Sequence, residues 1–219
     1  MEKHIVTTYD NDLESLKNNL LEMCVLVEKQ LFMSVEILKI SNEEKIKKIL
    51  ATENQVNKLE LKIREMATNT LSKRQPLADD LRQIIISIKI SSIIERIGDH
   101  SANIAKRVSQ ADITPRDYTT DSIFRLGQSV RNIVSLAVNA YSSENEELAS
   151  SIPVEDKQID LLYETCFREH IVLMMESYKT IGYLTQMIFI SKELERIGDL
   201  TKSISKEVLY SLKGKLMKY

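Results

Sequence analysis

The sequence has no tryptophan, five glycines and three prolines among its 219 residues, and only 5% of its residues are aromatic. Glycine and proline destabilise helix interiors, so their scarcity permits long uninterrupted helices. Leu, Ile, Lys, Glu and Ser are abundant instead, a composition typical of all-α proteins. Hydrophobic residues make up 43% of the chain, which is enough to build a substantial core.

Cysteine is also scarce. The two cysteines, Cys24 and Cys166, are far apart, and neither belongs to a Cys-x-x-Cys pair. Two such thiols do not make a disulfide framework, so we expect both to be buried and reduced in a cytoplasmic protein. The three histidines, His4, His100 and His170, lack the spacing of metal ligands, which argues against structural zinc.

Long hydrophobic runs and an excess of one charge are missing as well. The most apolar stretch, residues 81–94, is short and contains Arg82 and Lys89, which excludes a membrane span. The first residues are polar, so we expect no signal peptide. The formal net charge is −2, so no overall field attracts nucleic acid. We therefore expect a cytoplasmic protein that binds no nucleic acid and contacts membranes at most peripherally, through its partners.

Helical periodicity and turn residues divide the chain into six expected helices. Ser41 with Glu44, and Ser143 with Glu146, form capping-box patterns at the starts of the second and the fifth. The helices are expected at about residues 10–40, 41–71, 78–109, 121–141, 143–178 and 180–212, with a polar turn at 72–76, a linker at 111–120 that contains Pro115, and a basic tail at 213–219.

A five-residue motif occurs twice, about a hundred positions apart, as Glu95-Arg96-Ile97-Gly98-Asp99 and as Glu195-Arg196-Ile197-Gly198-Asp199. About half of the positions agree between the wider segments around the two copies. The order of the helices also repeats, with a small insertion expected near Pro153, where the fifth helix would bend or bulge. Because short connections favour antiparallel neighbours, we predict a tandem duplication of an antiparallel three-helix bundle, in units 1–110 and 111–219.

Each motif places a glutamate and an aspartate four residues apart, which stacks the two carboxylates on one face of a helix. A helical wheel of the third helix puts Glu95 and Asp99 nearly opposite its core stripe, and the sixth helix repeats this with Glu195 and Asp199. Like charges at this spacing repel by roughly 0.2–0.5 kcal/mol per exposed pair, so a repeated pair suggests a positively charged partner. The core stripes comprise Ile86, Ile90, Ile93, Ile94, Ile97, Ser101, Ile104 and Val108 in the third helix and Ile190, Leu194, Ile197, Ile204 and Val208 in the sixth.

Further acidic residues lie in the neighbouring helices. Asp156 and Asp160 are again four residues apart in the fifth helix, and the matching positions of the second helix carry Glu53 and Asn57. Because Asn57 offers only a neutral oxygen, the two sites need not be equivalent. Oxygen ligands of this kind favour Mg²⁺, Mn²⁺, Ca²⁺ or oxidised iron. The predicted metal ligands are Glu95, Asp99, Glu195, Asp199, Glu53, Asp156 and Asp160.

Other interpretations of these residues stay open. The acidic faces could be merely solvated, or could pair with cations on a neighbouring helix, and Arg96 and Arg196 could link the halves. Gly98 and Gly198 each cost roughly 1 kcal/mol relative to alanine inside a helix. They could serve close helix packing, leave room for a ligand, or both.

At these residues the chain resembles the PhoU family of phosphate-signalling regulators. The two Glu-Arg-Ile-Gly-Asp copies match that family's repeated E(D)-x-x-x-D motif, and residues 74–82 resemble the turn before its third helix. The resemblance covers nearly the whole chain and implies a cytoplasmic protein of two three-helix bundles. It also implies metal clusters on the outer face, with iron or zinc among the metals. Carried over by position, Glu95, Asp99, Glu195 and Asp199 are the best ligand candidates.

The resemblance further implies the partners. Members of the family act with the phosphate ABC transporter and a membrane sensor histidine kinase, and they repress phosphate-starvation genes when phosphate is plentiful. We therefore expect a non-enzymatic negative regulator of phosphate uptake and signalling that binds the transporter ATPase and the kinase. We also expect it to form a homodimer.

Two functions compete with this one. A carboxylate-bridged metal enzyme, such as a di-iron oxidase, would use Glu-x-x-His pairs pointing into a bundle core, and no glutamate here has a histidine three residues later. The other alternative is a metal-binding or purely structural helical scaffold without a phosphate role. The sequence has no nucleophile triad, phosphate-cradling glycine loop or nucleotide motif, so we expect no enzymatic activity.

Overall fold

The computed structural model describes residues 2–74, 76–110 and 121–214, and these residues are almost entirely helical. Six long α-helices follow one another, with one short 3-10 helix, η1, before the last. The all-α class and the six helices predicted from the sequence are thus confirmed. The elements are α1 (Glu2–Glu36), α2 (Glu43–Arg74), α3 (Ala78–Gln110), α4 (Asp121–Ser142), α5 (Glu146–Glu176), η1 (Tyr178–Thr180) and α6 (Ile181–Lys213).

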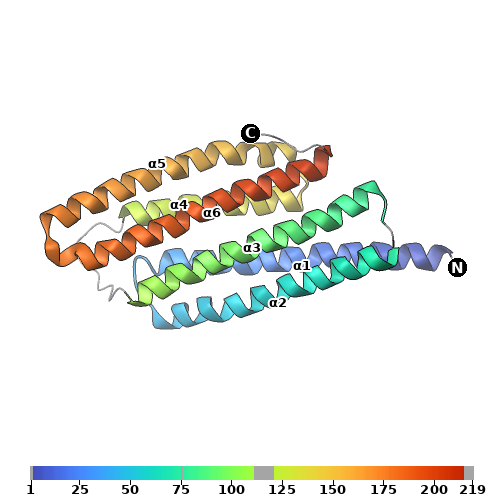
Figure 1. The fold of residues 1–219 in the computed structure, drawn as a ribbon, viewed down its shortest axis with the longest axis horizontal. Coiled ribbons are helices and arrows are strands. Elements are labelled where there is room, and N and C mark those ends of the chain that lie inside the picture. Colours follow the sequence, from blue (N-terminus) through green and yellow to red (C-terminus); the bar gives the residue numbers. More distant parts are fainter. Residues whose placement is uncertain (1, 75, 111–120, 215–219) are drawn as a thin grey trace.

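The helices form two antiparallel three-helix bundles that lie side by side (Figure 1). In the first half α1, α2 and α3 pack on one another, as do α4, α5 and α6 in the second. The halves join where α3 packs against α6, with further contact between α1 and α4. Figure 1 shows α2 and α5 at the opposite outer edges. The predicted architecture is confirmed, whereas the division into units 1–110 and 111–219 stays a prediction.

The buried face of each central helix follows the periodicity of the sequence. In α3 every residue of the expected core stripe is buried except Ile93, which is half-buried. The whole expected stripe of α6 is buried. No described helix is long and apolar enough to cross a membrane. Burial of an aliphatic side chain contributes roughly 1.5–3 kcal/mol, so the continuous cluster formed by these stripes and their neighbours supplies much of the folding free energy.

The starts of α2 and α5 differ from the predicted capping boxes. The side chain of Asn42 accepts a hydrogen bond from the backbone N–H three residues later (2.8 Å), and Asn145 does the same (3.0 Å). Ser41 and Ser143 precede these caps, so the predicted capping role of the two serines is wrong. Asparagine side chains satisfy the free N–H groups of a first turn as well as serine does, which is why the choice was ambiguous.

The two caps also test the insertion predicted near Pro153. Asn42 and Asn145 are separated by the same number of positions as Glu53 and Asp156. α2 and α5 therefore keep one register from their caps to these acidic residues. The insertion predicted near Pro153 is wrong, because α5 continues as α-helix through Pro153 with no extra residue there.

Some helix ends also differ from expectation. α1 begins at Glu2 rather than near residue 10, and the Tyr9 hydroxyl donates to Asp80 Oδ2 (2.9 Å), which ties this part of α1 to α3. α5 ends at Glu176, where the chain enters η1. The predicted linker at 111–120, residue 75 of the polar turn and residues 215–219 of the basic tail lie outside the described residues.

We predict that Asn145→Ala lowers the free energy of unfolding by about 1 kcal/mol, because the first turn of α5 loses its side-chain acceptor. Ser143→Ala is the matched control and should change it by less than about 0.5 kcal/mol. The Ser143 hydroxyl only donates to the Asn139 carbonyl at an exposed position (2.6 Å). Urea denaturation followed by circular dichroism measures both variants, and equal losses would contradict the observed cap.

Candidate functional site

The first acidic cluster consists of carboxylates from α2 and α3, which pack against each other. Glu53 and Glu60 come from α2, two turns apart, and Glu95 and Asp99 come from α3, one turn apart. Glu60 is buried and the other three are half-buried. The predicted pair of α3 therefore lies away from the core stripe, as the wheel indicated, but α2 covers it in part.

Like-charge repulsion affects the protonation of this cluster. Burial, followed by the charges of Asp99 and Glu60, raises the pKa of Glu95. Burial, followed by the charge of Glu53, raises the pKa of Asp99. The Lys106 ammonium lies 3.5 Å from a Glu53 carboxylate oxygen and compensates part of the charge. A cation bound between the helices would relieve the rest.

Two further side chains, Arg64 and Asn57, border the first cluster. Glu60 forms an ion pair with Arg64, one turn further along α2. The amide oxygen of Asn57 is buried and has no hydrogen-bond partner. Leaving such an oxygen unpaired costs roughly 1–3 kcal/mol, and a hard cation accepts it as a neutral ligand.

The carboxylate and amide oxygens of the first cluster are therefore the kind of ligand that a hard cation prefers. Within the described residues, however, no three His, Cys, Asp or Glu side chains are grouped so that they could hold one ion. The carboxylates of α2 and α3 would have to move toward each other to coordinate a metal. Long flexible glutamate side chains such as Glu53 and Glu95 are able to make such a movement.

The second acidic cluster repeats this arrangement between α5 and α6 but contains a lysine. Asp156 of α5 is buried, and the Lys202 ammonium of α6 lies 2.6 Å from its Oδ2. The same nitrogen lies 2.8 Å from Asp199 Oδ1. Burial opposes the charged form of Lys202, but hydrogen bonds to both aspartates outweigh it and raise the pKa of Lys202. One ammonium thus joins the two helices through two carboxylates.

The other two predicted ligands of the second half are separate from this bridge. Glu195 forms an ion pair with Lys192 on its own helix, with 2.7 Å between Oε2 and Nζ. Asp160 lies one turn beyond Asp156 on α5 and is exposed. Three of the four carboxylates predicted to bind metal in this half therefore form ion pairs with lysine side chains, and Asp160 is not part of these pairs.

Both motif glycines are buried where a neighbouring helix comes close. A Cβ atom on Gly198 would lie 2.8 Å from Asp156 Oδ1 and 3.3 Å from the Ile159 side chain. A Cβ atom on Gly98 would lie 3.1 Å from Gln30 Oε1. Close packing accounts for Gly98, whereas Gly198 serves close packing and also leaves room for a carboxylate.

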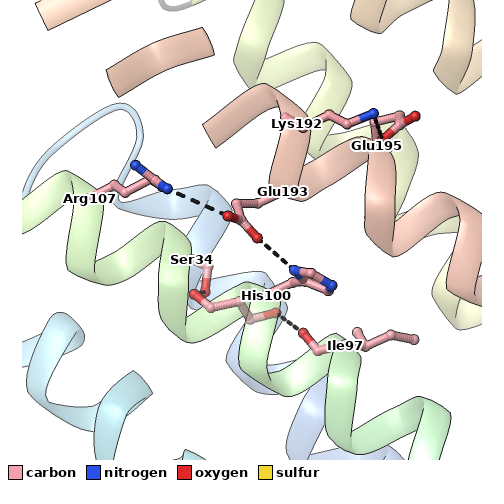
Figure 2. A network of polar contacts seen from close by, with 8 residues as sticks. Ser34, Ile97, His100, Arg107, Lys192, Glu193 and Glu195 are labelled. Atoms are coloured by element: carbon pink, nitrogen blue, oxygen red, sulfur yellow. Dashed lines mark hydrogen bonds and ion pairs between the residues drawn. The ribbon is translucent and has the colours of Figure 1, made fainter. Parts of the chain in front are cut away.

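A buried polar network crosses the junction of α3 and α6 beside both motifs (Figure 2). Glu193 Oε2 lies 2.6 Å from His100 Nδ1, and the other oxygen of Glu193 lies 3.8 Å from Arg107 Nε. Burial alone would raise the pKa of Glu193, but the hydrogen bond to His100 and the charges of His100 and Arg107 lower it overall. Because Glu193 is only 6% exposed, the network favours one register of α3 against α6.

The duplication places different residues at the equivalent positions of this junction. The counterparts of Glu193 and His100 are Ile93 and Leu200, which occupy the same places in the other motif segment. The pair formed by His100 and Glu193 is therefore polar, whereas the equivalent pair, Leu200 and Ile93, is apolar. The halves have kept the same fold while their side chains at the junction have diverged.

Cys166 lies beside a histidine but lacks the properties of a nucleophile. Its Sγ atom lies 3.5 Å from His170 Nδ1, and the Ser122 hydroxyl donates to it (3.8 Å). Burial raises the pKa of the Cys166 thiol to about 11 and lowers the pKa of His170, which favours the neutral form of both. Cys24 is also buried, and burial raises its pKa to about 12. Both cysteines are free and buried, as predicted.

Comparison with known proteins follows the same two halves. The family model described as the PhoU domain matches residues 20–108 and 123–208. The chain belongs to the PhoU family. A Pseudomonas putida protein named phosphate-specific transport system accessory protein PhoU homolog is 37% identical to this PhoU-family chain, over 96% of this chain and 83% of that protein. A protein of the same name from Zymomonas mobilis is 34% identical, over 98% of this chain and 90% of that protein.

Solved PhoU structures have the same fold. The crystal structure of PhoU from Pseudomonas aeruginosa matches with a TM-score of 0.89 at 33% identity, covering 94% of this chain and 100% of that one. The phosphate transport system regulatory protein PhoU from Streptococcus pneumoniae matches with a TM-score of 0.88 at 26% identity, over 96% of this chain and 100% of that one. The tandem duplication predicted from the two motifs is thereby confirmed.

Three features of this PhoU-family site were not predicted from the sequence. Glu60 follows Glu53 by two helical turns, so the same spacing argument that was applied to α3 could have found it. Lys202 follows Asp199 by three residues, a spacing that permits an ion pair on a helix. The pair of His100 with Glu193 joins segments that are far apart in sequence, and no local pattern indicates it.

We predict that His100→Leu lowers the free energy of unfolding by roughly 2–3 kcal/mol, because Glu193 stays buried and loses its nearest partner. The double variant His100→Leu/Glu193→Ile installs the residues of the equivalent positions and should recover most of that loss. Urea denaturation at neutral pH measures both variants. If the double variant were less stable than His100→Leu, the unpaired buried charge could not be the cause of the loss.

Proposed function

We propose that this chain is a cytoplasmic negative regulator of phosphate uptake and of phosphate-starvation signalling. Its membership of the PhoU family carries the proposal, together with relatives named as an accessory protein and a regulatory protein of phosphate transport. The protein acts by binding the ATPase subunit of the phosphate ABC transporter and a sensor histidine kinase, and it catalyses no reaction. We further propose that it works as a homodimer.

The chemistry of a groove between the ends of α1, α3, α4 and α6 supports a protein-binding role over direct phosphate binding. Two cations line this groove. Lys17 forms an ion pair with Glu144 (2.8 Å), and Arg82 forms one with Asp79 (3.2 Å). Both cations are thus already engaged, so neither favours a phosphate group there.

An exposed apolar strip on α5 supports a protein partner. We define the α5 strip as four residues on one face of α5: Val154 (61% exposed), Leu161 (58%), Val172 (54%) and Met175 (83%). The equivalent positions of α2 carry smaller or polar residues, namely Ala51, Lys58, Asn69 and Ser72. The two helices occupy corresponding outer edges of the molecule (Figure 1), so the difference is not required by the fold. We assign the transporter ATPase subunit to the α5 strip, since apolar surface of this kind favours protein contacts.

We also propose that the carboxylates bind a divalent or trivalent metal ion. The first cluster supports this best, because Ala102 stands where Lys202 bridges two carboxylates in the second, and because the Asn57 oxygen lacks a partner. Burial raises the pKa values of Glu95 and Asp99, but it also raises the pKa of Asp156, so the lysine is what distinguishes the clusters. Oxygen ligands favour iron, manganese, magnesium or calcium, and zinc is the softer alternative. Three of the ligands predicted in the second half form ion pairs with lysines, which disfavours a metal there; they are Glu195, Asp199 and Asp156, whereas Asp160 is exposed one turn away.

We predict that Glu95→Gln with Asp99→Asn lowers the metal content of the purified protein, because the two substitutions remove negative charge and keep the side-chain size. The helical circular dichroism signal should remain. Elemental analysis of protein purified without chelator measures the metal per chain. Glu155→Gln with Glu164→Gln, at exposed positions of α5, is the matched control. Unchanged metal content in the α3 variant would show that these side chains are not the ligands.

We predict that deleting the gene releases phosphate-dependent repression of starvation genes, and that the wild-type chain restores it. Leu161→Lys/Val172→Asn copies α2 residues into the α5 strip, so it should fold but fail to restore repression. It should also fail to capture the transporter ATPase subunit in a pull-down. Lys58→Ala/Asn69→Ala on α2 is the matched control and should restore both.

Constant repression after deletion would count against the regulatory role. Capture of the ATPase subunit by Leu161→Lys/Val172→Asn would place that partner on another surface. If the α5 strip instead pairs two copies of the chain, this variant should fall from dimer to monomer in light scattering while capturing the ATPase subunit normally.

A further inference from the structure

The second acidic cluster carries a lysine at two positions where the first has none. Lys202 corresponds to Ala102 when the two motifs are aligned, and Lys192 corresponds to Ser92. Lys106 of the first half has a lysine counterpart, Lys206, so that cation does not distinguish the halves. The second cluster has therefore gained positive charge at a place where the first has a small apolar side chain.

We infer that Lys202 is a built-in cation that occupies the second acidic cluster, so that an external metal ion binds only at the first. The inference rests on the proposed binding of metal by the first cluster. It concerns the position between Asp156 and Asp199, where the structure places an ammonium group.

The geometry at Lys202 is that of a cation held by two ligands. Its nitrogen lies 2.6 Å and 2.8 Å from carboxylate oxygens on two different helices. Asp156 is only 2% exposed, and Gly198 leaves room for its carboxylate beside α6. A metal ion could reach Asp156 only by displacing the ammonium or by sharing the carboxylate with it, and the two positive charges would repel.

A tethered cation and a dissolved one have different consequences. Lys202 is always present, so the contact between α5 and α6 is stabilised at every metal concentration. The first cluster has Lys106 beside Glu53 and Arg64 beside Glu60, but it has Ala102 at the position from which Lys202 bridges two carboxylates. The packing of α2 on α3 would then respond to metal concentration, while the packing of α5 on α6 would not. The first half is thereby the metal-responsive half.

Titration with Mn²⁺ tests the inference through the number of ions bound per chain. The background is Glu95→Gln/Asp99→Asn, in which the first cluster is disabled and the second is intact. Adding Lys202→Met to this background should create one Mn²⁺ site per chain, with affinity raised about tenfold or more over the background. Adding Asp156→Asn as well should remove that site. Lys206→Met, exposed on the same helix, makes the same change in net charge and should create none. Lys202→Arg keeps the charge and should also create none.

The inference is overturned if Lys202→Met binds no more Mn²⁺ than Lys206→Met in this background. It is also overturned if the background itself binds a full equivalent of Mn²⁺ that Asp156→Asn abolishes, a test that needs no change at Lys202. Failure of the proposed metal role is a different result, namely equal Mn²⁺ binding by the wild type and by Glu95→Gln/Asp99→Asn with Lys202 intact.

Thermal unfolding provides a second measurement on the same variants. Lys202→Met leaves the buried Asp156 carboxylate without its cation, so its melting temperature should fall in the absence of metal. Saturating Mn²⁺ should raise the melting temperature of Lys202→Met by more than it raises that of Lys206→Met. An equal shift in the two variants would contradict the inference.

Discussion

A carboxylate held between packed helices needs positive charge beside it, and this requirement governs both halves of the molecule. Asp156 illustrates it most clearly, since the close approach of α5 to α6 at Gly198 buries its carboxylate and Lys202 supplies the charge. Glu193 meets the same requirement at the junction of the halves, through His100 and Arg107. Burying a charge without such a partner costs several kcal/mol, so these contacts are conditions for the packing.

The first half meets the requirement incompletely. Lys106 lies near Glu53, and Arg64 pairs with Glu60, but Ala102 stands at the position from which Lys202 bridges two carboxylates in the second half. In a regulator of phosphate transport, a half that completes its charge balance only with a metal ion offers a means of control that a self-contained half does not. The two halves of this PhoU-family protein therefore share a fold and differ in the lysines beside their carboxylates. Their outer helices differ as well, because α5 exposes an apolar strip at positions where α2 carries smaller or polar residues.

Much of the fold could be predicted from the sequence, because its signals are local. Isoleucines at helical spacing indicated the buried stripes of α3 and α6, and the repeated motif indicated two bundles. The helix starts were less predictable, since serine and asparagine are both good caps and only the three-dimensional hydrogen bonds identify Asn42 and Asn145. The mistaken insertion near Pro153 arose from the same ambiguity, because it depended on matching Ser41 with Ser143 rather than Asn42 with Asn145.

The candidate site was predictable only in part. The spacing within each helix placed Glu95 with Asp99 and Asp156 with Asp160, but spacing cannot tell how far a neighbouring helix covers a face. How closely the helices pack decides that Glu95 and Asp99 are partly buried. It also decides that Lys202 of α6 contacts Asp156 of α5. The pairing of His100 with Glu193 depends on the register of α3 against α6, which no single segment specifies.

We propose that the two clusters obtain their positive charge differently, one from solution and one from Lys202. A crystal structure of the wild-type protein grown with Mn²⁺, with anomalous scattering recorded at the manganese edge, tests it most directly. We expect an anomalous peak among Glu53, Glu95 and Asp99, and we expect the Lys202 ammonium between Asp156 and Asp199 with no peak there. A peak beside Asp156 with Lys202 turned away, or no peak at the first cluster, would contradict it.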